Sequence, residues 1–326
     1  MFVHRSIAWL VALGCVAVVT GCSAEAQGPE AAAESVDQQL TSQASVAFQA
    51  NTNFLWVQNS NGVGVDQHFG MLSHTVPSLV QLPGSGFAVA FHANTGNLWL
   101  DENGVGTDQH FGMKVGTSPS IARLTNGQLA TAFQANTGNL WLDVAGVGTD
   151  QHFGMAANTS PSVVALANGQ SATAFQANTG NLWLDVSGTG TDQHLGMAPN
   201  TSPSIVQLSN GQLAVAFQAN TGELWLDVNG LGTNQHLGMK AGTSPSITQL
   251  SNGQIAVAFQ ANTGNLWVQV NGFGIDQHLG MAGTASPSIV ATGNGGWQVA
   301  FEANTGNLWL DVNGAGSDQF LGMNTP

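Results

Sequence analysis

Hydrophobic and polar residues alternate in short runs along this chain, and no stretch has a convincing helical period. In one run, Leu213, Val215 and Phe217 alternate with alanines and a glutamine. Short turn signals such as Asn-Gly and Asn-Thr-Gly separate the runs. The pattern predicts many short antiparallel strands joined by tight turns, and hence an all-β protein.

The runs recur as seven near-copies of one unit of 42 residues. One phenylalanine marks each copy; Phe48 and Phe91 are 43 residues apart, and the later intervals up to Phe301 are all 42. A methionine recurs every 42 residues from Met71 to Met323 without exception. The single extra residue of the first copy therefore lies in a turn around residues 59–62. Tandem units of this length are typical of a β-propeller.

Within one copy, residues 201–241, the pattern predicts four strands at residues 204–208, 213–219, 224–228 and 235–239. Asn229-Gly230 is a strong hairpin signal between the last two strands, because both positions accept a positive φ. A four-stranded blade cannot bury both its faces alone, so neighbouring blades must cover them. We therefore expect a seven-bladed β-propeller over residues 32–326. A β-solenoid is the main alternative, although its coils are usually shorter.

The first copy begins with a degenerate strand. Counting back from Phe48 aligns Ser35-Val36 with Ser204-Ile205, which places a first strand at residues 34–38. If that segment is not a strand, blade one has only three. The ring is expected to close directly, with the first blade against the last.

The N-terminus carries a processing signal. Arg5 precedes an apolar stretch at residues 7–19, which at 13 residues is too short to span a bilayer comfortably. The tetrapeptide ending in Gly21-Cys22 resembles the bacterial lipobox. The resemblance implies a signal peptide at residues 1–21, lipidation of Cys22, a flexible tether at residues 22–31, and a lipid-anchored protein of the bacterial envelope, at the outer membrane or cell surface. Ordinary secretion with cleavage after Ala26 is the alternative.

Charge and cysteine content narrow the classes of partner and chemistry. The formal net charge is −14 with only four lysines and arginines, which excludes a basic patch for nucleic acid or for an anionic membrane. The N-terminal lipid is then the only expected link to a membrane. With Cys15 removed and Cys22 acylated, the mature domain has no thiol for a disulfide, a thiolate metal site or a nucleophile.

Almost every polar candidate residue occurs in six or seven copies, which argues against an enzyme. Catalysis needs one preorganised constellation, whereas a repeated weak binding site gains avidity without new contacts. We therefore expect neither a catalytic residue nor a cofactor. Calcium is also disfavoured, because the Asp-x-Asn-Gly-x-Gly-x-Asp pattern at residues 101–108 lacks a side-chain oxygen at Val105, its fifth position.

One tryptophan per copy is the first binding candidate. In the fourth copy it shares a strand face with two polar neighbours, as Asn181-Trp183-Asp185. Two interpretations stay open: packing between blades, or an aromatic platform on which a sugar ring stacks. The seven residues are Trp56, Trp99, Trp141, Trp183, Trp225, Trp267 and Trp309.

An Asp-Gln-His run in the fourth strand is the second candidate. It either ties each blade to its neighbour through hydrogen bonds or forms a polar pocket wall. One histidine per blade is too few for a shared metal site. Phe320 replaces the histidine in the last copy. The runs singled out as polar ligand contacts are Asp108, Gln109 and His110; Asp150, Gln151 and His152; and Asp192, Gln193 and His194.

The repeat as a whole has a family resemblance. The string AFQANTGNLWL, followed by DQHLGM and TSPSI segments, resembles the repeats of bacterial PLL-type propeller lectins and, more loosely, of tachylectin or tectonin propellers. The resemblance implies multivalent binding of glycans or glycoconjugates at repeated sites between blades. The alternative is an envelope scaffold that binds proteins through a propeller rim and binds no sugar.

Overall fold

The computed structural model describes residues 44–324, which lie within one compact unit, Gln43–Pro326. The predicted signal peptide, the lipidation of Cys22, the tether and the strand at residues 34–38 fall outside the described residues. Among the described residues, no helix is long and apolar enough to cross a membrane.

Seven antiparallel sheets follow one another along the chain, and we number them as blades one to seven. Two short 3-10 turns, η1 (Pro83–Ser85) and η2 (Gly293–Gly295), are the only helical elements described. The strands are, in blade one, β1 Val46–Gln49, β2 Phe54–Gln58 and β3 Gly64–Gly70; in blade two, β4 Ser78–Gln81, β5 Phe87–His92, β6 Asn97–Glu102 and β7 Val105–Gly112; in blade three, β8 Ser120–Arg123, β9 Leu129–Gln134, β10 Asn139–Val144 and β11 Val147–Gly154; in blade four, β12 Ser162–Ala165, β13 Ser171–Gln176, β14 Asn181–Val186 and β15 Thr189–Gly196; in blade five, β16 Ser204–Gln207, β17 Leu213–Gln218, β18 Glu223–Val228 and β19 Leu231–Gly238; in blade six, β20 Ser246–Gln249, β21 Ile255–Gln260, β22 Asn265–Val270 and β23 Phe273–Gly280; and in blade seven, β24 Ser288–Ala291, β25 Trp297–Glu302, β26 Asn307–Val312 and β27 Ala315–Gly322.

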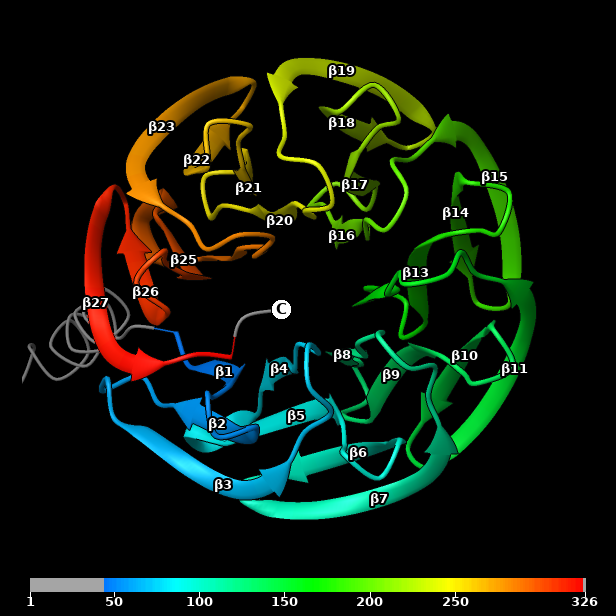
Figure 1. Cartoon of the computed structure of the whole chain (residues 1–326). Coiled ribbons are helices and arrows are strands. Elements are labelled where there is room, and N and C mark those ends of the chain that lie inside the picture. The colour runs from blue at the N-terminus through cyan, green and yellow to red at the C-terminus, as the bar shows by residue number, and fades with distance from the viewer. Residues whose placement is uncertain (1–43, 325–326) are drawn as a thin grey trace, which may run out of the picture. The chain divides into compact units, whose positions relative to one another are not determined.

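The sheets stand around a central axis, with the short first strands inside and the long fourth strands on the circumference (Figure 1). Blades two to seven each pair four strands in sequence order, and blade one has three strands among the described residues. The seven-bladed β-propeller predicted from the repeat is confirmed.

In blade five the bounds of the first three strands lie within one residue of the prediction, and those of the fourth strand differ more. In blade five the outer strand β19 begins at Leu231, four residues before its predicted start. The Asn229-Gly230 turn pairs Val228 directly with Leu231, so the ladder starts at once. In blade one the extra residue widens this hairpin at residues 59–63, as expected.

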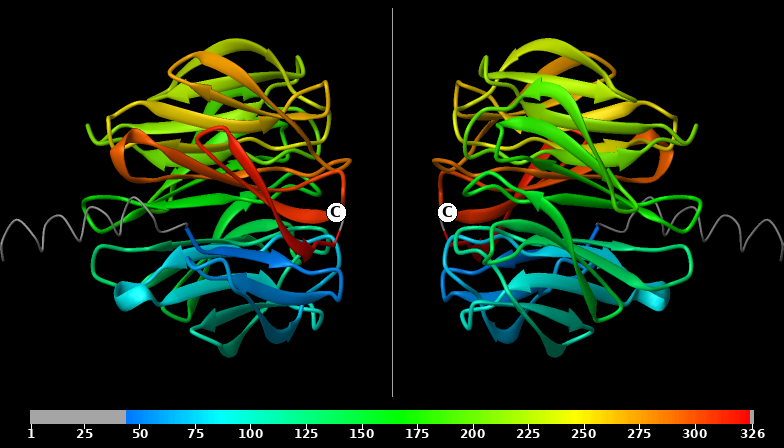
Figure 2. Two further views of the ribbon diagram at one scale, coloured as in Figure 1. Left: turned by 90° about the vertical axis from the view of Figure 1, so that its left-hand side faces the viewer. Right: turned by 90° about the vertical axis from the view of Figure 1, so that its right-hand side faces the viewer.

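The first and last blades close the ring through the same contact that joins all the other neighbouring blades. Met71 of blade one forms a bridge to Ala93 of blade two, and Met323 of blade seven forms the same bridge to Ala50 of blade one. Asn51 N also donates to Gly322 O at 3.2 Å, as Asn94 N does to Gly70 O at 3.0 Å. The side views show β27 running beside the strands of blade one (Figure 2).

The hydrophobic core lies between blades. One cluster combines Ala88 and Leu98 of blade two with Phe133 of blade three, each with no exposed surface. Equivalent clusters repeat around the ring. Each repeat therefore buries its faces only by contact with its neighbours, which is the reason the unit recurs.

Candidate functional site

Each outer strand contains a β-bulge at its Asp-Gln-His run, or at the Asn-Gln-His and Asp-Gln-Phe variants of that run in blades five and seven. In blade two, the register shifts between Asn97, which pairs with Gly112, and Trp99, which pairs with Asp108. His110, inside the bulge, has a φ of 59°, in the left-handed region. Bulges redirect side chains, and a positive φ at a non-glycine residue costs free energy. This strained conformation recurs at every copy of the position, including Phe320 with a φ of 56°.

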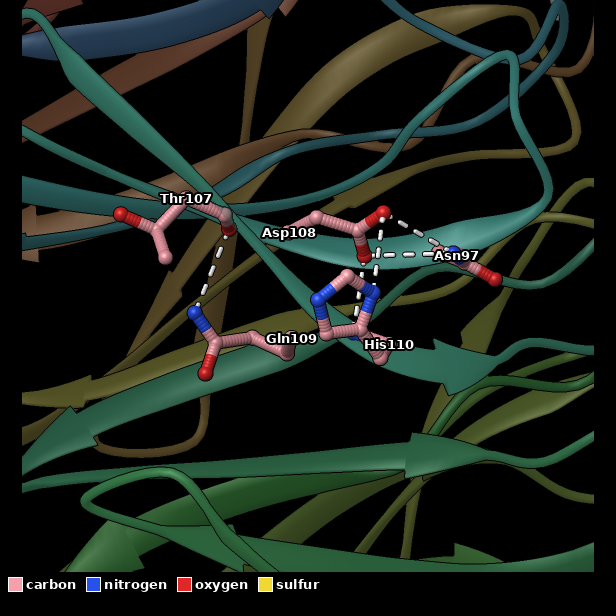
Figure 3. Close-up of polar contacts among 5 residues, drawn as sticks. All are labelled: Asn97, Thr107, Asp108, Gln109 and His110. Atoms are coloured by element: carbon pink, nitrogen blue, oxygen red, sulfur yellow. Dashed lines mark hydrogen bonds and ion pairs between the residues drawn. The ribbon is translucent and has the colours of Figure 1, made fainter.

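The bulge assembles a polar cluster of one partly buried asparagine, one partly buried aspartate and one exposed histidine, which we call the Asn–Asp–His cluster (Figure 3). Asn97 Nδ2 donates to both carboxylate oxygens of Asp108, at 3.2 and 3.1 Å. The backbone N of His110 donates to Asp108 Oδ1 at 2.7 Å, which fixes the turn. The His110 ring lies 3.5 Å from Asp108 Oδ2 through Nδ1 and is 85% exposed. A carboxylate held in place beside an open imidazole offers both acceptor and donor groups to a ligand.

The glutamine of the run does not face this cluster. Gln109 Nε2 donates to Thr107 O of its own strand at 3.2 Å, on the other side of the strand (Figure 3). The structure thus brings the predicted aspartate and histidine together with an asparagine outside the predicted set and separates them from the glutamine. The hydrogen bonds of the aspartate stay within one blade, so they do not tie blades together.

The tryptophan stands next to the aspartate of the cluster, because Trp99 and Asp108 are cross-strand partners. Side chains of such partners lie on the same face of a sheet. All seven repeated tryptophans are partly buried, neither open platforms nor fully enclosed. The two sets of candidates found in the sequence therefore meet at one place in each blade.

Packing accounts for part of each tryptophan's role. The Trp99 ring lies 6.1 Å from Phe69 of blade one and 6.3 Å from Phe91 of its own blade, centroid to centroid. The indole nitrogen of every repeated tryptophan is buried without a hydrogen-bond partner. The tryptophan thus forms part of the contact between blades, and any ligand would meet only the remaining exposed part of its ring.

The cluster is not the same in all blades. Blades two, three, four and six carry the complete set of Trp, Asn, Asp and His. In blade five the acid and amide exchange strands, and Asn234 Nδ2 donates to Glu223 Oε2 at 2.6 Å. Blade seven has Phe320 in place of the histidine, and blade one has Phe54 in place of the asparagine. Four complete clusters and three variants therefore surround the ring.

A second set of polar residues, the aspartates that flank the tryptophans on the third strands, is buried. Asp185 is 2% exposed, and its counterparts Asp101, Asp143, Asp227 and Asp311 are no more exposed. Burial raises the pKa of each of these carboxyls. Gln269 occupies the position in blade six and donates to Gln235 Oε1 of blade five at 2.7 Å. The alternation of hydrophobic and polar residues in the sequence could not distinguish these buried aspartates from exposed ones.

Metal ligation finds no support in the described part of the chain. No three His, Cys, Asp or Glu side chains there come close enough to hold an ion together. The Asp101 carboxylate instead accepts a hydrogen bond from Gly104 N at 2.7 Å, so the calcium-like pattern is a hairpin turn.

Comparisons with known proteins show what the fold resembles. No family model and no curated protein matches the sequence. Among solved structures, a lectin from Aleuria aurantia in complex with Fucα1-6GlcNAc matches with a TM-score of 0.54 and 15% identity over 79% of this chain and 98% of that one. A structure of the same fungal lectin is described as a six-bladed β-propeller.

Two further structural neighbours, a lectin and a lyase, have different functions. SapL1 lectin in complex with α-methyl fucoside matches with a TM-score of 0.55 and 12% identity over 80% of this chain and 99% of that one. Virginiamycin B lyase from Staphylococcus aureus matches with a TM-score of 0.51 and 10% identity over 74% of this chain and 82% of that one. At these identities the similarity shows the β-propeller fold, and one fold serves both lectins and an enzyme.

Proposed function

We propose that this protein is a multivalent carbohydrate-binding propeller, without enzymatic activity, carried on the bacterial surface by a lipid at Cys22. The observation that carries the proposal is the repeated Asn–Asp–His cluster beside a partly exposed tryptophan. A carboxylate, an amide and an imidazole complement the hydroxyl groups of a sugar, and an indole face complements its C–H face. Lectins among the structural neighbours support the same class of ligand.

Repetition favours binding over catalysis. Four complete clusters on one rigid ring present the same groups several times, so that weak single sites add up on a multivalent glycan. The histidine keeps its strained backbone in six blades and is 85% exposed in the five that pair it with an aspartate. An open side chain held in a costly conformation is more typical of a binding residue than of a packing residue.

The test is isothermal titration of the full chain with α-methyl fucoside, the sugar in the SapL1 complex, after a glycan array has surveyed other sugars. We expect about four sugars per chain if the complete cluster is needed. His194→Phe reproduces the residue of blade seven and should remove one site while leaving the fold intact. Absence of any glycan ligand on the array would overturn the proposal.

A second candidate function is a scaffold for protein partners. It rests on large apolar side chains at the hairpin tips that open the outer strands: Val105, Val147, Leu231 and Phe273 are 68, 69, 74 and 78% exposed. Exposed apolar groups on one rim favour protein contact. A stoichiometric protein partner whose binding no glycan competes for would select this function.

A further inference from the structure

The inner ring of the propeller has a gap in blade one. Neighbouring first strands contact each other from β4 through β8, β12, β16 and β20 to β24. Between β24 and β4, where blade one has no first strand among the described residues, lies a cavity of about 480 Å³. β1, β4 and β24 line it, and we call it the strand slot.

A chain of serine hydrogen bonds runs around the inner ring and has its two ends at the slot. The first residue of each described inner strand is a serine, and in β4, β8, β12, β16 and β20 its Oγ accepts from a backbone N of the next blade, as Ser78 does from Ile121 at 3.2 Å. The series continues through Ser120, Ser162 and Ser204 and finishes with Ser246, which accepts from Ile289 at 3.1 Å. Within the described residues, Leu79 N donates to no serine of a preceding blade, and Ser288 Oγ accepts from no backbone N of a following blade.

Side chains that flank the slot are more exposed than their counterparts elsewhere. Leu79 is only partly buried, whereas Ile121, at the same position, is 6% exposed. On the other flank, Ser288 is exposed and Val290 is 41% exposed, while their counterparts in the other blades are at least partly buried. The lack of one inner strand in blade one explains the exposure on both flanks. An inner strand packs one face against the preceding blade and the other face against the following blade.

We propose that residues 35–38 of this chain fill the strand slot as the fourth strand of blade one. Their sequence supplies the groups that the slot lacks. Ser35 aligns with the serine of every other inner strand, so its Oγ would accept from Leu79 N, and Val36 N would donate to Ser288 Oγ. Val36 also matches the branched apolar residue that is buried in blades three to seven.

The length of the connection fits as well. In blade five, Gln207 pairs with Leu213 across a five-residue turn. Gln38 and Ala44 are also separated by five residues, and Ala44 lies at the slot, two residues before the start of β1. Gln38 further matches Gln207 and Gln249, whose side chains each accept a backbone N–H from the turn of the preceding blade. A segment of the same chain is therefore the occupant that register, spacing and chemistry favour.

The proposed strand at residues 35–38 determines the rim of the ring from which the preceding N-terminal segment departs. A first strand starts at the rim where the outer strands end, near Met71 and Met323, and finishes at the opposite rim. With residues 35–38 in the slot, the preceding segment departs near Met323; with the slot open, it departs from Ala44 at the rim of the hairpin tips. If Cys22 is lipidated, the strand thus determines which rim faces the membrane.

Cross-linking tests the register. In the full chain with Cys15→Ser and Cys22→Ser, the pair Ser35→Cys and Ala47→Cys reproduces the cross-strand partners Ser204 and Ala216. Cross-strand partners have the Cα separation that a disulfide needs. We expect mild oxidation to form this disulfide within one chain. The control pair, Val36→Cys with Ala47→Cys, has its side chains on opposite faces and should stay reduced.

Equal oxidation of both pairs, or of neither, would overturn the proposal, and disulfide-linked dimers would assign the slot to a second copy. Hydrogen exchange of the unmodified chain gives an independent readout. Residues 34–39 should exchange as slowly as residues 203–208, their counterparts in blade five. Fast exchange throughout residues 34–39 would refute the inserted strand. Neither result depends on glycan binding.

Discussion

The buried carboxyl of Asp101 gives the sharpest prediction about stability. Its Oδ1 accepts from Gly104 N, whereas Oδ2 is buried without a hydrogen-bond partner. Burial raises the pKa of this carboxyl, the Gly104 bond opposes the shift, and the charge of Glu102 adds to it. Asp101→Asn keeps an oxygen for Gly104 and replaces the unsatisfied carboxylate oxygen by an amide donor.

Blade six shows that the position accepts an amide, because Gln269 there donates to a glutamine of the preceding blade. An unsatisfied buried polar group costs about 1–3 kcal/mol. We expect Asp101→Asn to increase the free energy of unfolding by about 1 kcal/mol near neutral pH, the lower end of that range. Urea unfolding followed by tryptophan fluorescence measures the change.

The pH dependence has a defined sign. Because the folded-state pKa is raised, the folded chain binds more protons than the unfolded chain, and stability falls as pH rises through that pKa. The advantage of Asp101→Asn should therefore be largest near neutral pH and shrink towards about pH 4. Glu102→Gln removes the same charge from an exposed neighbour and should change stability by less than about 0.5 kcal/mol. A destabilised Asp101→Asn variant, or a pH-independent gain, would refute this reasoning.

Three further predictions follow from single positions. A Cβ at Gly190 would lie 2.5 Å from Phe153 Cζ, so Gly190→Ala should lower the thermal midpoint of unfolding. A Cβ at Gly283 would have nothing within 4 Å, so the control Gly283→Ala should leave the midpoint unchanged. Equal midpoints for the two variants would contradict the packing of Phe153 against Gly190. His92 is fully buried, and burial lowers its pKa, so the stability of the chain should fall as pH drops below about 6.5. His92→Gln should reduce that loss of stability, which thermal melts at about pH 7.5 and pH 5.5 would measure. Phe320→His completes the cluster of blade seven and should add one site per chain in a sugar titration; an unchanged site number would show that the histidine is dispensable.

Much of the fold could be predicted from the sequence because the repeat is nearly exact. Seven copies of one phenylalanine, tryptophan and methionine fixed the blade number and the strand order. The outer strands were predicted too short, because residues 231–234 lack strong alternation and only the hairpin register extends them. The bulge was not foreseen, since a left-handed histidine leaves no mark in a hydrophobic pattern.

The candidate site could be predicted only in part. Tryptophan and aspartate were identified on different strands, and their adjacency depends on the cross-strand register of Trp99 and Asp108. Asn97 was not among the predicted site residues, because its role comes from the hydrogen bond to Asp108. Asp185 was grouped with Trp183 as a polar neighbour, but it is 2% exposed, because this face of the strand packs against the preceding blade, where Phe153 lies beside Trp183. Contacts between blades are absent from the pattern of any single repeat.

The central claim is that the repeated clusters bind sugar, and a glycan array tests it most directly. The array would be probed with the labelled full chain and with a variant that carries His110→Phe, His152→Phe, His194→Phe and His278→Phe together. Phe320 adopts the same left-handed backbone as these histidines, so the variant should fold. We predict that the parent chain binds at least one class of glycan and that the variant loses most of this binding. No glycan bound by the parent, or equal binding by a folded variant, would contradict the claim.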